Sequence, residues 1–319
     1  MDELPQYVAD EYEPTIDLSW RGRPEPLSAL QISVQEQFHF EIDRFALDWD
    51  VGQEFFRILD DLLCPQSVVE PQSAAAAIAE LYSSTLRRIL DGTTDCCEEE
   101  DLPGSFCYNF FYSLFFIAKQ LPAKDEQLQE KLVDFLAFLR KIPTTSRAKV
   151  EWRDLPRLPW AASDIKNDIW ISDAEDERKR IEELNFHAFI ARQTVRAKIT
   201  GVGTSDAIWG LQILSGALEN EPDPRSKAYQ TQGPMLDETI PLAAQWIKLC
   251  GEQIFEIDKY IGSYAAGGRK WKGKQGFCLE RWQFWRRRFS EISEFEQASD
   301  ETRRVCKETA RLMEEIERA

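Results

Sequence analysis

The sequence predicts an all-α fold: an irregular multi-helix bundle of two packed halves, without a regular solenoid repeat. Apolar residues recur at three- and four-residue spacing almost everywhere after about residue 31. No stretch keeps strict alternation of apolar and polar residues long enough to indicate a strand. With 43% hydrophobic residues in 319, the chain can bury a core without disulfide bonds.

Three helices are predicted in the first half. After a run of alanines, the apolar residues within 81–90 recur at helical spacing, and Gly92 ends this predicted helix. Residues 106–121 are aromatic on several faces, which is typical of a central helix buried all round. Leucines and phenylalanines of 128–139 form a single stripe that Pro143 ends.

The second half has the same helical pattern. Five further helices are expected, over residues 182–199, 205–218, 236–261, 279–295 and 302–316. The segment 143–177 separates the halves, because its prolines interrupt the pattern and three tryptophans lie there in otherwise polar sequence. The tryptophans favour packing against the body, so we interpret this segment as a seam and not as a free linker.

The first 27 residues differ from the rest of the chain. Residues 1–27 contain seven acidic residues, four prolines and little periodic apolar character, which predicts a largely disordered acidic tail. Residues 28–319 are then one helical domain. Trp20 is the exception in the tail, and we expect it to pack on its own domain.

Composition limits the partners and the compartment. A net charge of -17 disfavours nucleic acid, and no apolar run approaches the ~20 residues that span a bilayer, so neither nucleic acid nor a membrane is expected as partner. The acidic start is unlike a signal peptide, and the seven cysteines form no disulfide framework. A cytoplasmic or nuclear protein with reduced thiols, not a secreted one, is expected.

The most distinctive segment is 271–289, which reads W-x-G-x-x-G-F-x-x-x-R-W-x-F-W-x-x-R-F. Residues 265–289 hold eight Lys or Arg and one Glu, a local charge of +7 that leaves -24 for the rest. The predicted structural signature is Trp271, Phe277, Trp282, Trp285 and Phe289. Arg281 and Arg288 flank this stripe closely enough to be partly buried, so each needs a carboxylate partner.

The loop before the last two helices has two interpretations. Glycines let backbone N–H groups approach an anion, lysines neutralise it, and a helix N-terminus follows. The candidate anion or ligand residues are Lys270, Lys272, Gly273, Lys274, Gly276 and Arg281. In the other interpretation, which we favour, aromatic side chains fix the loop to the core and its cations face the acidic surface.

The sequence gives little support for a metal site or for a nucleophilic cysteine. The two histidines are far apart, and we place His39 on a helix face, so no metal site and no cofactor are expected. The motif of residues 60–64, D-D-L-L-C, lacks the third carboxylate of a magnesium site. Cys107, Cys250 and Cys306 lie in apolar helical sequence, where thiols are inert, and Cys278 is expected to be packed.

Several local patterns together resemble a known family. They are W-x-D-L-P at 152–156, F-H-A-F-I-A-R at 186–192, A-I-W-x-L at 207–211, A-L-E at 217–219 and the 271–289 block. Over roughly residue 31 to the end, the chain resembles a fungal family of all-helical proteins known as domain of unknown function 3632. The resemblance implies a helical fold and an intracellular setting, and no activity.

Two functions therefore stand. The first is an intracellular interaction or regulatory module, which the acidic surface and the lack of a catalytic constellation favour. The alternative is a small-molecule-binding protein, or a metal-free and cofactor-free enzyme of fungal specialised metabolism, because helical bundles with aromatic interiors host such pockets.

Overall fold

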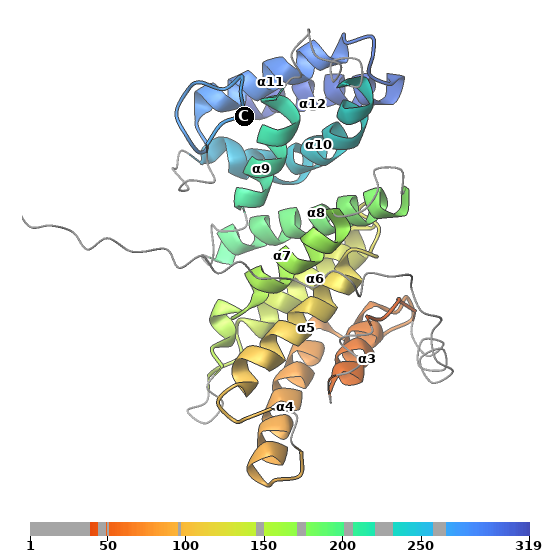
Figure 1. The fold of residues 1–319 in the computed structure, drawn as a ribbon, viewed down its shortest axis with the longest axis vertical. Helices are drawn as coiled ribbons and strands as arrows, with labels where there is room; N and C mark the ends of the chain where they lie inside the picture. Colours follow the sequence, from red (N-terminus) through yellow and green to blue (C-terminus); the bar gives the residue numbers. More distant parts are fainter. Residues whose placement is uncertain are drawn as a thin grey trace, which may run out of the picture. The chain divides into compact units, whose positions relative to one another are not determined.

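A computed structural model describes residues 39–43, 49, 51–94, 97–144, 150–170, 177–200, 207–220, 232–257 and 266–319. The tail of residues 1–27, Trp20 and Cys96 lie outside these residues. The compact unit begins at Phe38. In its described part, ten α-helices and one 3-10 turn occur and no strand does, which confirms the predicted all-α class (Figure 1).

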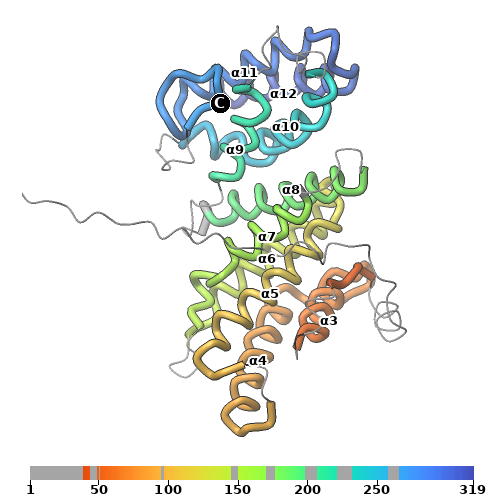
Figure 2. Tube along the Cα trace, in the orientation of Figure 1, coloured from red at the N-terminus to blue at the C-terminus, as the bar shows by residue number. Residues whose placement is uncertain are grey.

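The first helices pack around α5. They are α3 (Gly52–Leu63), α4 (Pro71–Leu90), α5 (Leu102–Ala118) and α6 (Glu126–Leu139). The α5 side chains Phe106, Phe110, Phe111 and Phe115 are fully buried, as the aromatic pattern predicts. α5 contacts α3 on one side and α7 (Leu158–Trp170) on another (Figure 2).

The remaining helices surround α10. They are α8 (Glu177–Thr200), α9 (Ala207–Leu218), α10 (Gln232–Glu256), α11 (Leu279–Ser293) and α12 (Asp300–Arg318). α10 packs on α8, α9 and α12, and α11 packs mainly on α12. α8 contacts α6 and α7 as well as α10, so it belongs to both sets of helices (Figure 1). Burial on two sides explains why its middle, F-H-A-F-I-A at 186–191, is apolar all round.

The described part of the seam contains a helix that the pattern did not predict. A 3-10 turn at Trp152–Asp154 precedes α7, which packs on α5 and α8. Pro159 is the second residue of α7, where a missing N–H breaks no helical hydrogen bond. Trp152 is buried edge-on against Tyr82 and Phe106, whereas Trp160 is 62% exposed.

The placement of His39 differs from the prediction. It lies in a bend ahead of α3 and not on a helix face. The bend is fixed to the end of α5, because Gln120 accepts a hydrogen bond from the Glu41 N–H (2.8 Å) and donates one to the Glu41 carbonyl (3.0 Å). A glutamine in the turn after a distant helix determines this conformation, so local periodicity carries no sign of it.

His187 is a core histidine. Its ring is fully buried among Phe186, Trp209 and Trp246, and Nδ1 accepts a hydrogen bond from Trp246 Nε1 (3.3 Å). Burial, and then the charge of Lys166, lowers the pKa of His187 to about 3 from the usual 6.5. The ring is therefore neutral in the folded protein at physiological pH, with its proton on Nε2.

This shift predicts a pH dependence of stability. The folded-state pKa of His187 lies below the unfolded value, so the unfolded chain takes up the proton first as the pH falls. The contribution of His187 is complete above pH 6.5 and decreases toward pH 3, with a loss of about 2 kcal/mol at about pH 5.

Urea denaturation of the wild type and of His187→Gln, which keeps an acceptor for Trp246, measures this effect. The difference between their free energies of unfolding should change by about 2 kcal/mol, in favour of the variant, from neutral pH to about pH 5. Parallel pH profiles of the two proteins would refute the assignment.

Candidate functional site

The basic loop, residues 266–278, is attached to the end of α9 through its backbone. The Gly268 N–H donates to Glu219 Oε2 (2.7 Å), the Lys270 N–H to the Glu219 carbonyl (2.9 Å) and the Arg269 N–H to Asn220 Oδ1 (3.2 Å). These N–H groups face the protein. They are thus committed to holding the loop in place.

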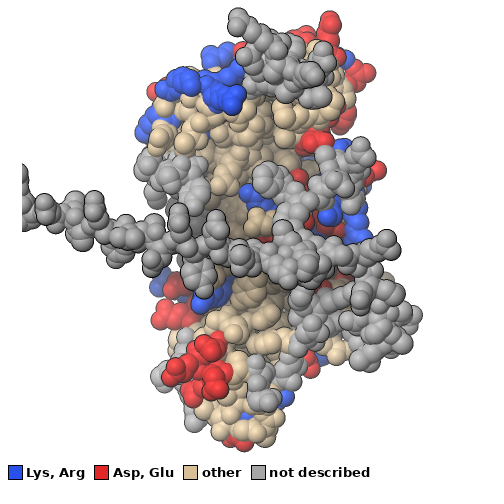
Figure 3. Space-filling view, in the orientation of Figure 1, with Lys and Arg blue, Asp and Glu red and all other residues tan. Residues whose placement is uncertain are grey.

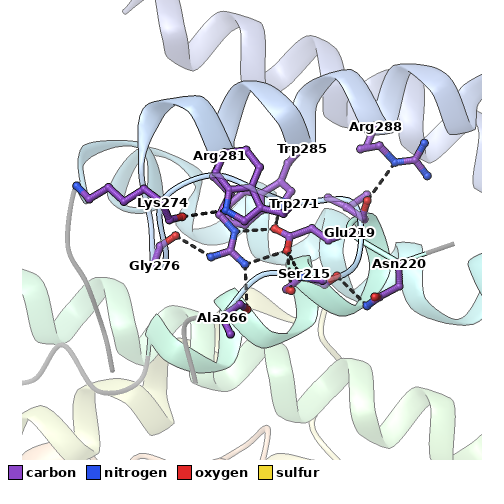
Figure 4. A network of polar contacts seen from close by, with 12 residues as sticks. Ser215, Glu219, Asn220, Ala266, Trp271, Lys274, Gly276, Arg281, Trp285 and Arg288 are labelled. Atoms are coloured by element: carbon purple, nitrogen blue, oxygen red, sulfur yellow. Dashed lines mark hydrogen bonds and ion pairs between the residues drawn. The ribbon is translucent and has the colours of Figure 1, made fainter. Parts of the chain in front are cut away.

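Glu219 and Arg281 form an ion pair at the centre of this arrangement, and both side chains are 0% exposed. Arg281 Nε lies 2.6 Å from Glu219 Oε1, and Nη2 lies 2.9 Å from Oε2 (Figure 4). The carboxylate also accepts from Trp285 Nε1 (2.7 Å) and from Ser215 Oγ (2.9 Å). The requirement for a carboxylate beside Arg281 is confirmed, and Glu219 meets it.

The remaining N–H groups of Arg281 face backbone carbonyls of the basic loop. Nη1 donates to the Gly276 carbonyl (2.8 Å), and Nη2 lies 3.4 Å from the Ala266 carbonyl. Arg281 therefore joins α11, the loop and α9. Arg288, also buried, donates to the Leu218 carbonyl (3.0 Å) and pairs with Glu291, so its predicted carboxylate partner is confirmed too.

Two glycines of the loop have structural explanations. A Cβ on Gly273 would come within 2.4 Å of the Trp271 ring, whose Nε1 donates to the Lys274 carbonyl (2.8 Å). Gly276 has φ = 80°, a left-handed conformation that favours glycine, and it turns its carbonyl toward Arg281. Neither residue needs an anion to account for it.

The lysines of the loop have a different placement. Lys270, Lys272 and Lys274 are exposed, and the Lys274 amine points away from the ion pair (Figure 4). Lys and Arg side chains gather at this edge of the α9–α12 set in Figure 3. The structure thus separates the predicted loop residues into a buried Arg281 and exposed lysines, and an anion site there stays a prediction.

The aromatic residues of the same block are mostly in the core. Trp282, Trp285, Phe289 and Phe277 are at most 1% exposed, whereas Trp271 is half-buried. The thiols follow the expectation as well. Cys107, Cys250, Cys306 and Cys278 are buried, and burial raises the pKa of each of the first three to about 12.

A groove along α10 contains a cation that is not among the predicted site residues. Its volume is about 430 Å³, and α8, α10, α12 and the turn before α6 line it. The lining is apolar at Leu184, Pro241, Ala244, Leu249, Val305 and Leu312, and charged at Lys124, Glu126, Arg192, Lys248 and Glu308.

Arg192 is the buried charge of this groove. Its side chain is 7% exposed, with Nη2 donating to the Ala123 carbonyl (3.2 Å) and Nε 3.7 Å from Glu130 Oε1. Nη1 is buried and has no hydrogen-bond partner among the described residues. Burial lowers the pKa of Arg192, an effect that Glu130 and Glu126 oppose.

An unsatisfied buried N–H of a charged group is costly, by about 1–3 kcal/mol. A guanidinium stays charged in proteins, so it cannot escape this cost by losing a proton. A ligand oxygen can reach Nη1 only after the groups that cover this atom move, because Nη1 has almost no accessible surface. Arg192 ends the 186–192 pattern noted above, and an arginine within an apolar helix was the only signal for it.

Some other kinds of site find no support in the described part of the chain. It contains no group of three or more His, Cys, Asp or Glu side chains able to hold a metal ion. None of its helices combines the length and the apolar character that crossing a bilayer requires.

Comparison with known proteins gives one match. Neither the curated proteins nor the solved structures contain a significant match to this chain. One family model matches residues 111–289, more than half of the chain, and this range includes Arg192, Glu219 and Arg281. The chain belongs to the family described as "Protein of unknown function (DUF3632)".

Proposed function

We propose that this protein is an interaction module that binds an amphipathic segment of a partner protein, with one carboxylate, in the groove of α8, α10 and α12. The observation that carries the proposal is the charged Arg192 side chain, only 7% exposed, in the lining of a largely apolar groove. Arginine in a desolvated pocket is a frequent energetic centre of protein interfaces, because a partner carboxylate then gains a charge-assisted hydrogen bond.

The charges around the groove specify the partner further. Lys124 and Lys248 are exposed and line the groove, so they attract a carboxylate toward Arg192. Glu126 and Glu308 line it as well and repel a second acid. The favoured partner segment therefore has one carboxylate among apolar side chains. Packing such a segment against helices is a common mode of peptide recognition.

A display library of short peptides tests this proposal. Selection on the full chain should return segments with one Asp or Glu, or a free C-terminus, between apolar residues. Fluorescence anisotropy then gives the dissociation constant of each. Arg192→Gln should weaken binding at least about tenfold, because a neutral amide replaces the buried charge.

Arg87→Gln is the matched control, because Arg87 is an exposed arginine on α4, away from the groove. It should leave the dissociation constant unchanged, and thermal melts should show that both variants are folded. If selection returns no such segment, or if Arg192→Gln binds as tightly as the wild type, the proposal is wrong.

The second candidate, a small-molecule carrier, is supported by the groove volume of about 430 Å³, which lies in the range of small-ligand sites. Arg192 and the apolar lining then favour a small ligand that has one carboxylate on an apolar chain. If decanoate but not decanol stabilises the wild type, and Arg192→Gln loses that response, a small carboxylate becomes the favoured ligand.

A further inference from the structure

His39, Asp60 and Cys64 form a linear relay at the end of α3; none of them lines the groove, and all three lie outside the range of the family match. Cys64 Sγ lies 3.7 Å from His39 Nε2, and His39 Nδ1 lies 2.9 Å from Asp60 Oδ2. The imidazole is between the thiol and the carboxylate. This is the order in which a nucleophile, a base and an orienting acid act.

The backbone places these residues without help from a ligand. Asp60 and Cys64 are one helical turn apart, and the Cys64 N–H donates to the Asp60 carbonyl (2.8 Å). Asp60 is 7% exposed, and its Oδ1 accepts the His39 N–H (2.8 Å). The carboxylate thus binds His39 at two points, which fixes the orientation of the ring.

The hydrogen bonds also fix the tautomer. Asp60 Oδ2 accepts, so His39 Nδ1 carries the proton and Nε2 presents its lone pair to Sγ. The thiol is half-buried, and the His39 side chain is 55% exposed, so a substrate can reach the sulfur. The Cys64 thiol also lies within reach of Gln66 Oε1 (3.4 Å), which can accept its proton in a hydrogen bond before a substrate binds.

We propose that Cys64 is a nucleophile that accepts acyl groups from activated esters or thioesters, with His39 as its base and Asp60 as a positioning residue. The Sγ–H proton passes to His39 Nε2 while Sγ bonds to the acyl carbon. The bond from that carbon to the leaving oxygen or sulfur breaks, and His39 returns the proton to the leaving group. Water then attacks the thioester carbon and gives a proton to His39, the bond from that carbon to Sγ breaks, and His39 returns the proton to Sγ, which releases the acid and restores the thiol.

The position of Cys64 makes the base essential. It follows the last residue of α3, where the negative end of the helix dipole opposes a thiolate. Cysteines at helix N-termini are activated by the opposite effect. Proton transfer to His39 must therefore accompany the attack on the acyl carbon.

Acetylation by p-nitrophenyl acetate tests the proposal on the full chain. Released nitrophenolate gives the rate, and peptide mass spectrometry locates the acetyl group. At about neutral pH, Cys64 should react on the order of 10- to 100-fold faster in the wild type than in His39→Ala. The difference between the two acetylation rates should disappear at high pH, where thiols ionise without a base.

Asp60→Asn separates positioning from folding. The amide oxygen of the new asparagine still accepts the hydrogen bond from the His39 backbone N–H, so its NH2 group faces the ring nitrogen Nδ1. Nδ1 must then accept a hydrogen bond, which places the ring proton on Nε2. Acetylation should slow by at least about tenfold at neutral pH, with an unchanged thermal melt. Cys97, another half-buried cysteine, is the internal reference, and Cys97→Ser should not alter the rate at Cys64.

Two results would overturn the proposal. One is acetylation of Cys64 no faster than that of Cys97 in the same protein. The other is a Cys64 rate that His39→Ala and Asp60→Asn leave unchanged at neutral pH. If His39→Ala is unfolded, His39→Gln replaces it, because glutamine supplies no base.

Discussion

Replacement of Glu219 by glutamine is expected to lower the free energy of unfolding by about 3–5 kcal/mol. The carboxylate is fully buried and binds Arg281, Trp285, Ser215 and the Gly268 N–H. Its removal leaves the Arg281 guanidinium buried and charged without a counter-ion. Urea denaturation of the soluble variant measures the loss, and failure to express in soluble form is its extreme outcome.

Two further variants give this prediction its controls. Glu80→Gln removes the carboxylate beside Arg87, and both of these side chains are exposed, so the cost should stay within about 1 kcal/mol. The double variant Glu219→Leu with Arg281→Met should recover much of the stability, since well-packed apolar residues often match a buried pair. A Glu219→Gln protein as stable as the Glu80→Gln protein would show that the pair does not hold the loop.

Trp282→Ala and Trp285→Ala should each cost about 3–5 kcal/mol. Both side chains are 1% exposed, and each alanine leaves a cavity that the surrounding helices fill only in part. Trp282 packs against Phe255 of α10 and donates to Glu317 of α12 (2.9 Å). Its loss therefore weakens the contacts of α11 with two helices.

Trp160→Ala is the matched control, because this tryptophan is largely exposed, and its effect should stay within about 0.5 kcal/mol. Trp285→Phe keeps most of the apolar volume and removes the donor to Glu219, so it measures that hydrogen bond separately. If the alanine variants have wild-type stability but bind partner peptides more weakly, Trp282 and Trp285 belong to a recognition surface and not to the core.

The periodic parts of the fold could be predicted from the sequence. Burial on one face leaves a mark at three- and four-residue spacing, as in the stripe of Trp282, Trp285 and Phe289. The need for an acid beside Arg281 follows from the cost of a buried charge. Its identity could not be predicted, because Glu219 lies 62 residues away and only the packing of α9 on α11 brings the two together.

Sites that several helices form together could not be predicted from the sequence either, because their residues lie far apart along the chain. The groove of Arg192 needs α8, α10 and α12 together, and none of these segments has a distinctive motif for it. In the sequence, Asp60 and Cys64 belong to a motif that resembles part of a magnesium site, and His39 lies in a separate segment with a predicted helical pattern. Gln120 holds the His39 segment beside the end of α5, and Asp60 holds it against α3.

The buried pair also constrains how the sequence can evolve. A chain with both charges replaced by apolar residues could be as stable as the present one. Either single substitution, however, leaves one buried charge alone and costs several kcal/mol, a large part of the stability of a typical domain. Selection therefore acts against each intermediate. Glu219 and Arg281 can be retained because every single-step route away from them passes through a poorly folded protein.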